Sequence, residues 1–568
     1  MNPSSSFTTP RPTVQLHLPD GRILEGPRGA TAESLLAPIA DTLPAPLVGV
    51  IVNGSLHDLL HPIDLEARVR PVTLAEVDGA RIYRRSLTFL LDVAFATLFP
   101  GASLAIEHSL ASGGYFCHVT GRPPLTTDDL ARLEAEMRRL VALDLPFTPH
   151  RIPTADALAL FEEQQQPDKA ALMRHRRKST ITLYQLGDHF DDRHGFLVPS
   201  TRYLTRFDLV PLEDSFALRY PRQHSPDRLT PLARYPKLLA SFRQYGAWLS
   251  KLGIGHVGAL NDAIQAGRSR EVILVSEALH EQSIAHIARQ IAERGDAARL
   301  VLIAGPSSSG KTTFSRRLTV QLIALGLSPY ALELDNYFVD RSRTPRDADG
   351  KLDYETIDAL HLTQLGDHLQ RLLAGEEVQL PRYSFQEGRQ YPGEIVRLRP
   401  GQLVLLEGIH GLNPRLIPPA LAARSFQIYA SALTQLNLDR TNRISTTDTR
   451  LIRRIVRDAR DRGYNAADTI GRWESVRRGE KLHIFPHQEN ANVMFNSALA
   501  YELSALRPLA EPLLRQVTPG TPEYVEARRL LAFLEWFEPM DPEWIPDDSI
   551  LREFIGGSIL ADFKVWGG

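Results

Sequence analysis

Cysteine is nearly absent from this chain of 568 residues, which contains only Cys117. A single thiol cannot form an intramolecular disulfide, so the fold does not depend on one. Chains without disulfides are typical of reducing compartments. We therefore expect a cytoplasmic protein.

Long apolar runs and an excess of one charge are also missing. The most hydrophobic window, Leu87 to Ile106, is interrupted by Asp92, Thr97 and Pro100. Its apolar residues recur at helical spacing, which predicts an amphipathic core helix rather than a membrane span. The 65 Lys and Arg residues nearly balance the 67 Asp and Glu residues, so the net charge is only -2. No chain-wide field attracts nucleic acid or anionic lipid, and we expect no membrane partner.

The length predicts several domains, because 568 residues exceed what one hydrophobic core usually organises. Hydrophobic residues at 43% and charged residues at 23% are ordinary for soluble globular domains. We expect six parts: a disordered lead-in (1–12), an α+β domain (13–76), a second α+β domain (77–221), a helical linker (222–294), an α/β domain (295–505) and a helical C-terminal extension (506–568).

The first of these domains alternates short strand patterns around one helical stretch. The runs VQLHL, LVGVIVNG and ARVRPV are strand-like, and AESLLAPIA is helical. The dipeptide Asn53-Gly54 is typical of a hairpin turn. These patterns predict a small α+β domain.

From Leu300 onward, strands alternate with longer helical patterns. The runs LVLIA, YALEL, QLVLLEG and SFQIYA are short, continuously apolar and rich in branched residues. Continuous hydrophobicity is typical of parallel strands that are covered on both faces. We therefore expect a doubly wound α/β domain with a parallel sheet.

A phosphate-binding loop follows the first of these strands. The stretch GPSSSGKT, from Gly305 to Thr312, fits the Walker A pattern between a strand and a helix. Its glycines let the backbone wrap closely around an anion, and its N–H groups point at that anion. Lys311 supplies positive charge, and the Thr312 hydroxyl can face Mg²⁺. This context argues against an accidental Gly/Ser-rich turn. The candidate ATP-binding residues are Gly305, Ser307, Ser308, Ser309, Gly310, Lys311, Thr312, Thr313 and Arg457.

Two acidic residues end neighbouring strand patterns. Asp335 follows YALEL, and Glu407 ends QLVLLE. Parallel sheets bind ligands beyond the carboxyl ends of their strands, so both carboxylates are expected at the catalytic edge. Asp335 is a candidate general base, and Thr312, Glu407 and Asp335 are candidate metal ligands. Helix capping is the competing interpretation for each acid.

Arginine is concentrated in one segment. Eight arginines and no lysine lie between Arg440 and Arg462. Four of them fall at helical spacing and share one face. Because guanidinium groups bind phosphate oxygens in bidentate fashion, we interpret the segment as a mobile lid rather than a solvated surface. The arginines on this face are Arg450, Arg453, Arg454 and Arg457.

The segment from about Leu300 to Tyr501 resembles the uridine kinase and phosphoribulokinase family of P-loop kinases. The resemblance rests on GPSSSGKTT, LDNYF, PRYSFQEGR, LLEGI and DTRLIRRIVRD. It implies an ATP- and Mg²⁺-dependent phosphotransferase with a nucleoside acceptor. Its implied catalytic residues are Asp335, Lys311, Arg450 and Arg453, with Arg457 on ATP.

The acceptor side matches this family less well. In uridine kinases a Tyr-Asp-Phe element is followed by a His that reads the base. In this chain Ser384 replaces the Asp, and Gly388 stands where the His would be. Glu355 stands where the family has an Asp that holds ribose. Ordinary core packing is the alternative for the two aromatic residues. The candidate substrate residues are Tyr383, Phe385, Arg389, Glu355 and Arg450.

The two leading domains resemble the N-terminal half of threonyl-tRNA synthetase. Thr13 to Thr73 is similar to a TGS domain, which has a β-grasp fold. Arg81 to about Val210 is similar to the synthetase's editing domain, through RRSLTFLLDVAFATLFPGASLAI and YQLGDHFDDRHGFLVPST. The resemblance implies RNA or tRNA as a partner of these domains.

The residues of the editing reaction are replaced in this chain. The His-x-x-x-His pair of the synthetase corresponds to Arg85 and Phe89, and its later Cys and His correspond to Arg193 and Leu197. We therefore expect neither editing nor a metal site there. The two arginines either present positive charge to an RNA or nucleotide anion or are ordinary surface residues.

Two classes of function remain open. The first is a kinase that transfers the γ-phosphate of ATP to the 5′-hydroxyl of a nucleoside, or to an RNA end or another sugar-like alcohol. The second is an ATP-dependent regulatory protein that binds RNA or tRNA. We favour the kinase, because a phosphate loop, strand-end carboxylates and an arginine lid together exceed what binding requires. Three points stay open: whether ATP or GTP is the donor, which base the acceptor carries, and whether the protein forms a homo-oligomer.

Overall fold

The computed structural model describes residues 9, 11–110, 113–233, 235–347 and 350–563. Contacts divide the chain into two compact units. The first comprises the residues up to Ala233 together with Asn437–Arg443 and Val517–Arg529, and the second comprises the rest. The lead-in expected over 1–12 falls almost wholly outside the described residues, and the six-part division stays a prediction.

The first unit begins with a five-stranded sheet of order β2-β1-β5-β3-β4. Strand β1 pairs in parallel with β5, and the other pairings are antiparallel. The expected hairpin is present, because Asn53 and Gly54 adopt φ values of 49° and 81° between β3 and β4. The elements are β1 (Thr13–His17), β2 (Ile23–Pro27), α1 (Ala32–Ala40), β3 (Leu47–Val52), β4 (Ser55–His57) and β5 (Ala67–Thr73).

The second part of this unit is built around helix α2 (Val77–Leu98), whose apolar face lies in the core. The helix ends earlier than the window Leu87–Ile106 suggested, because Pro100 and Gly101, with φ 85°, break it before strand β6. Two antiparallel sheets follow, with orders β11-β12-β7-β6 and β10-β9-β8. The elements are β6 (Ser103–Leu110), β7 (Gly114–Thr120), α3 (Thr127–Ala142), β8 (Thr148–Pro153), α4 (Thr154–Glu163), α5 (Pro167–Arg174), β9 (Thr180–Leu186), β10 (His189–Asp191), β11 (Asp208–Leu212) and β12 (Ser215–Arg219).

The second unit contains a five-stranded parallel sheet of order β14-β17-β13-β18-β19. Strand β13 is central and fully buried, which explains its continuously apolar sequence. The expected doubly wound sheet is confirmed, and β19 adds a fifth strand that the sequence pattern did not reveal. The strands are β13 (Leu300–Ala304), β14 (Pro329–Glu333), β17 (Leu403–Glu407), β18 (Ser425–Ser431) and β19 (Val493–Asn496).

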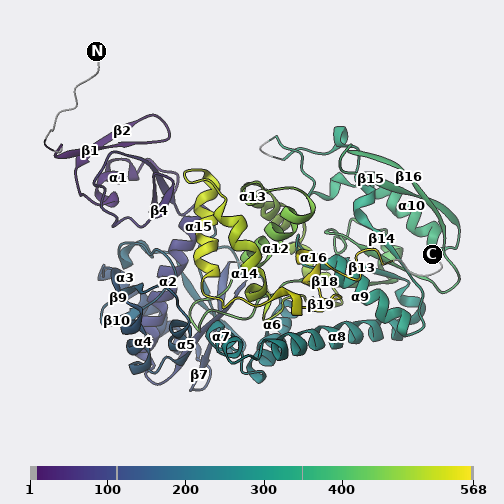
Figure 1. Cartoon of the computed structure of the whole chain (residues 1–568), viewed down its shortest axis with the longest axis horizontal. Coiled ribbons are helices and arrows are strands. Elements are labelled where there is room, and N and C mark those ends of the chain that lie inside the picture. The colour runs from purple at the N-terminus through teal and green to yellow at the C-terminus, as the bar shows by residue number, and fades with distance from the viewer. Residues whose placement is uncertain (1–8, 10, 111–112, 234, 348–349, 564–568) are drawn as a thin grey trace, which may run out of the picture. The chain divides into compact units, whose positions relative to one another are not determined.

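Helices and one hairpin complete this unit (Figure 1). The long helix α8 packs along α9, which follows the phosphate loop. The hairpin β15–β16 carries the aromatic segment of the candidate acceptor site. The elements are α6 (Pro236–Lys251), α7 (Val257–Gln265), α8 (Ser269–Arg294), α9 (Lys311–Ala324), α10 (Leu362–Leu373), β15 (Glu377–Ser384), β16 (Arg389–Arg397), α11 (Pro419–Ala422), α12 (Thr446–Asp461), α13 (Ala466–His483), α14 (Glu502–Arg515) and α16 (Arg552–Ile555), while α15 (Pro522–Leu534) spans both units.

None of the helices in the described part of the chain is long and apolar enough to cross a membrane. The apolar face of α2 is instead covered by the core of the first unit.

The phosphate loop approaches strand β18 so closely that only glycine fits. A Cβ atom added at Gly305 would lie 1.9 Å from the carbonyl oxygen of Ala430. We expect Gly305→Ala to lower the free energy of unfolding by about 2 kcal/mol or more, measured by urea denaturation. Gly366→Ala is the matched control. Gly366 lies inside α10, and its added Cβ would lie 3.5 Å from Pro418, which is an ordinary van der Waals contact. Equal stability of the two variants would contradict this close packing.

Candidate active site

The phosphate loop connects the carboxyl end of β13 to the first turn of α9. Ser308 and Gly310 adopt positive φ values of 57° and 83°, which turn the chain back over the helix start. The first residue of the helix is Lys311. The N-terminus of a helix that follows such a loop is an anion-binding site.

Lys311 and Thr312 both face Glu407 at the end of β17. The Lys311 Nζ atom lies 3.9 Å from Glu407 Oε1 and donates to the Pro306 carbonyl at 3.2 Å. The Thr312 hydroxyl donates to Glu407 Oε2 at 3.1 Å. Burial raises the pKa of Glu407 to about 7, with Asp335 adding to this effect and Lys311 opposing it. A buried lysine, a hydroxyl and a carboxylate therefore meet at one edge of the sheet.

Asp335 reaches the same edge from β14. It lies in a short 3-10 turn, two residues beyond Glu333, which pairs in register with Glu407. Its side chain is accessible to solvent. Partial loss of hydration raises the pKa of its carboxyl, while Lys311 lowers it. Asp335 can thus accept a proton beside the phosphate loop.

Two of the predicted lid arginines lie beneath the loop. Arg450 is 2% exposed, donates to the Ser307 carbonyl at 2.8 Å and pairs with Glu480. Arg453 is 0% exposed and pairs with Glu502 at 2.6 Å. Both guanidinium groups brace the loop in this structure, so their predicted contact with a transferring phosphoryl group stays a prediction.

Arg454 and Arg457 lie one turn further along the same face of α12. The Arg454 side chain donates to the Ser307 hydroxyl at 2.9 Å. Arg457 pairs with Asp458 at 3.0 Å and remains partly exposed. Arg462 acts electrostatically on Asp335, lowering the pKa of its carboxyl. Arg454 was predicted as part of the lid face without an individual role at the site, and Arg462 was counted in the arginine-rich segment without being singled out.

Two carboxylates bind the loop N–H groups. Glu480 accepts a hydrogen bond from the Ser307 N–H at 3.0 Å. Glu553, on α16, accepts from the Thr313 N–H at 3.2 Å and from its hydroxyl at 3.1 Å. Neither glutamate was predicted, because each lies far from the loop in sequence and belongs to no recognisable motif. Both carboxylates accept hydrogen bonds from N–H groups at the loop and in the first turn of α9.

The acceptor side contains an aromatic cluster on the β15–β16 hairpin. Tyr383 and Phe385 meet edge to face with ring centroids 5.0 Å apart, and Phe338 contacts both. Phe385 is 54% exposed, whereas Tyr383 is buried. Its hydroxyl has no hydrogen-bond partner among the residues that the structure covers. Core packing therefore describes Tyr383 better than Phe385.

Glu355 is a further carboxylate of this region. Burial and the neighbouring Glu480 raise its pKa to about 7, while Arg454 and Lys311 act in the opposite direction. Its Oε2 atom is buried and lacks a hydrogen-bond partner within the described ranges. Arg389 is exposed at the start of β16. Glu355 is thus an acceptor-side residue whose charge interacts with that of Lys311 at the end of the phosphate loop.

The four editing-type positions in the first unit carry no metal-binding residues. Phe89 and Leu197 lie in the core, and Arg85 donates to the Phe196 carbonyl at 3.3 Å. The surface interpretation of Arg193 is wrong, because this residue is 1% exposed and pairs with Asp92 and Asp191. No group of three or more His, Cys, Asp or Glu residues able to hold a metal occurs in the described chain.

Comparison with known proteins separates the two parts of the chain. Residues 300–503 match the model described as "PRK: Phosphoribulokinase / Uridine kinase family". A solved structure described as a possible uridine kinase from Bacillus stearothermophilus is 25% identical, with a TM-score of 0.23, over 26% of this chain and 78% of that chain.

The N-terminal part is similar to threonine–tRNA ligases. The enzyme of Geobacter sp. (strain M21) is 30% identical over 36% of this chain and 32% of its own length. That of Acidiphilium cryptum (strain JF-5) is 31% identical over 31% of this chain and 27% of its own length. The chain thus spans about a third of the length of these curated relatives. Residues 300–503 are thus similar to the phosphoribulokinase/uridine kinase family, and the leading domains are similar to threonine–tRNA ligase.

Proposed function

We propose that this protein transfers the γ-phosphate of ATP to the 5′-hydroxyl of a nucleoside. The observation that carries the proposal is the meeting of Lys311, Glu407 and Asp335 beyond three adjacent parallel strands. A phosphate loop, a lysine and an accessible carboxylate are the parts that phosphoryl transfer requires.

Each group has a defined part in the reaction. Lys311 and the loop N–H groups hold the outer phosphates, since they supply positive charge and donors at a helix start. Asp335 accepts the proton of the acceptor hydroxyl, whose oxygen bonds to the γ-phosphorus as the bond to the ADP oxygen breaks. The hydroxyl of Thr312 and the carboxylate of Glu407 are oxygen ligands of the kind Mg²⁺ prefers, and Mg²⁺ bound with ATP neutralises charge on the phosphates.

A nucleoside acceptor is supported by the groups of the acceptor side. The Glu355 carboxylate has an open oxygen that can accept hydrogen bonds from sugar hydroxyls. The exposed ring of Phe385 offers a surface on which a base can stack. Ser384 and Gly388 supply neither the acid nor the histidine of uridine kinases. Another sugar-like alcohol, or an RNA end, is the alternative acceptor.

A second candidate function rests on the leading domains. Their similarity to threonine–tRNA ligases supports an ATP-dependent regulatory protein that binds RNA or tRNA. An electrophoretic shift with tRNA that persists at physiological salt, without nucleoside-stimulated ADP formation, would favour this function.

The proposed roles of Lys311 and of the general base Asp335 are tested by removing their charges. We expect Lys311→Ala and Asp335→Asn each to lower nucleoside-stimulated ADP release by about 100-fold or more, because both act on the transferring phosphoryl group. The assay is ADP release with Mg²⁺ and a panel of nucleosides. Lys251→Ala and Asp461→Asn are matched controls on exposed positions. Absence of stimulation by every nucleoside, with ATP binding intact, would contradict the proposal.

The position of Glu553 predicts competition with the nucleotide. A carboxylate that accepts from the Thr313 N–H both occupies a phosphate donor and repels phosphate. We expect Glu553→Gln to tighten ATP binding by about tenfold, measured by titration calorimetry. Glu543→Gln, on an exposed turn, is the matched control. Weaker ATP binding in Glu553→Gln would show that this carboxylate assists the nucleotide instead.

The raised pKa of Glu355 predicts a pH-dependent stability. The folded chain keeps this proton up to about pH 7, whereas the unfolded chain loses it near 4.5. Stability from this group therefore falls as pH rises between these values. We expect Glu355→Gln to raise the free energy of unfolding by about 1–2 kcal/mol near pH 8 and to leave it unchanged near pH 4. Urea denaturation at both pH values measures this, and an equal effect at both would contradict the shift.

A further inference from the structure

The loop between β18 and α12 contains a short segment, Asn437–Arg443, that belongs to the first unit by its contacts. We call it the anchor segment. The chain on both sides of it, up to Leu436 and from Ile444, belongs to the second unit. Only Ile444 and Ser445 separate the anchor segment from the first residue of α12. Whatever holds this segment therefore acts, through a very short connection, on the helix that carries the arginines of the candidate site.

The anchor segment binds the edge strand β6 of the first unit. A bulge at Glu107 interrupts the pairing of β6 with β7. The Ile106 N–H donates to the Arg440 carbonyl at 2.7 Å. The Asn437 side chain donates to the Ile106 carbonyl at 3.3 Å and to the Glu107 carbonyl at 3.1 Å. The segment thus satisfies backbone groups that the edge of a sheet would otherwise leave unpaired.

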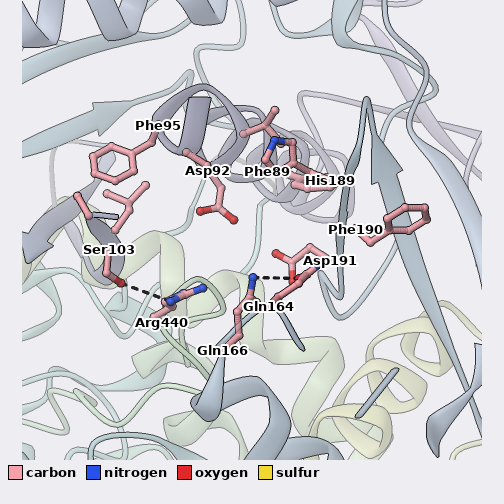
Figure 2. A pocket seen from close by; sticks show the side chains of 14 residues that line it. Phe89, Asp92, Phe95, Ser103, Gln164, Gln166, His189, Phe190, Asp191 and Arg440 are labelled. Carbon is pink, nitrogen blue, oxygen red and sulfur yellow. Dashed lines mark hydrogen bonds between the residues drawn. The ribbon is translucent and has the colours of Figure 1, made fainter. Parts of the chain in front are cut away.

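Two arginines of the anchor segment make further contacts in the first unit. The Arg440 N–H donates to Asp168 Oδ2 at 2.8 Å, at the start of α5. Its guanidinium donates to the Ser103 hydroxyl at 3.4 Å, on the wall of a cavity of this unit (Figure 2). The guanidinium of Arg443 lies over the ring of Tyr115, 5.4 Å from its centroid. Main chain and side chains are therefore both held.

Buried charge fixes the middle of the anchor segment. Asp439 is 2% exposed, and its Oδ2 atom lies 3.5 Å from His194 Nε2. The other ring nitrogen, Nδ1, lies 3.0 Å from Asp192 Oδ2. Although burial lowers the pKa of His194, Asp192 and Asp439 raise it to about 9, so the ring is cationic at neutral pH. The Asn442 side chain also donates to the Asp192 carbonyl, at 2.9 Å.

The start of α12 depends on such an anchor more than most helix starts do. Within the described part of the chain, its N-cap residue Ser445 makes no side-chain capping bond. The following turns carry Arg450 and Arg454, which donate to the Ser307 carbonyl and hydroxyl at 2.8 and 2.9 Å. Both bonds require the helix to start in the right place.

We propose that the first unit positions α12 through the anchor segment, and that Asn437, Asp439 and Arg440 are positioning residues of the proposed kinase site. The inference rests on the proposed function only for its effect on the reaction. The coupling runs along the chain itself, from Arg443 into the helix. Anchoring lowers the number of conformations open to the helix start, so less entropy is lost when its arginines bind beside the phosphate loop. The leading domains thereby gain a part in phosphoryl transfer that needs no RNA.

Hydrogen–deuterium exchange of the full chain without nucleotide tests the proposal. In the double variant Asn437→Ala/Asp439→Asn, we expect peptides that contain Ile106 and the first turns of α12 to exchange about tenfold faster, because the anchor is released. Peptides from β13, in the core of the second unit, should exchange as before. Asp188→Asn, an exposed carboxylate after β9, is the matched control and should change neither. Asn437→Ala alone, which removes no charge, decides if the double variant unfolds.

Titration calorimetry measures the consequence for the site. We expect the same variants to weaken ATP binding by about tenfold, because Arg454 then lies less often beside the loop. Neither exchange nor ATP binding needs an acceptor, so both results stand even if no nucleoside is phosphorylated.

Four outcomes would overturn the proposal. The first is faster exchange at Ile106 without any change in α12. The second is an equal increase in α12 and β13, which would indicate a general loss of stability. The third is unchanged exchange at Ile106, because the named side chains would then not hold the segment. The fourth is unchanged ATP affinity despite faster exchange in α12.

Discussion

The second unit depends on one physical requirement: the N–H groups of the loop between β13 and α9 must be satisfied. These donors point outward at a helix start, where the field favours a negative charge. Glu480 accepts from the Ser307 N–H of the loop, and Glu553 accepts from the Thr313 N–H in the first turn of α9. Arg450 and Arg453 donate to carbonyl oxygens of the same loop. Charge-assisted bonds of this kind contribute about 1.5–3 kcal/mol each, so these side chains hold the loop firmly.

The same requirement explains how the site can work. In the proposed reaction an incoming phosphate offers the loop stronger acceptors than a carboxylate, and Lys311 and Arg454 lie beside the loop. Burial and neighbouring carboxylates disfavour the ionised forms of Glu407 and Glu355, which raises both pKa values to about 7. Positive charge from Mg²⁺ or from a bound proton would reduce the repulsion between these carboxylates.

Local patterns predicted much of the fold but little of this network. The runs LVLIA and AESLLAPIA coincide with β13 and α1, because continuous or helical hydrophobicity is a property of neighbouring residues. Glu553 reaches the loop from 240 positions away, and Asp92 meets Arg193 across 101, so no local pattern could reveal either contact. For the same reason the arginine face of α12 was predicted, while the burial of Arg450 and Arg453 was not.

A crystal structure of the full chain with ADP and Mg²⁺ tests the central claim most directly. We predict that phosphate oxygens accept from the N–H groups of the loop, with Lys311 on the outer phosphate and Glu553 withdrawn from Thr313. A nucleotide bound elsewhere, with Glu480 and Glu553 still on the loop, would contradict this account.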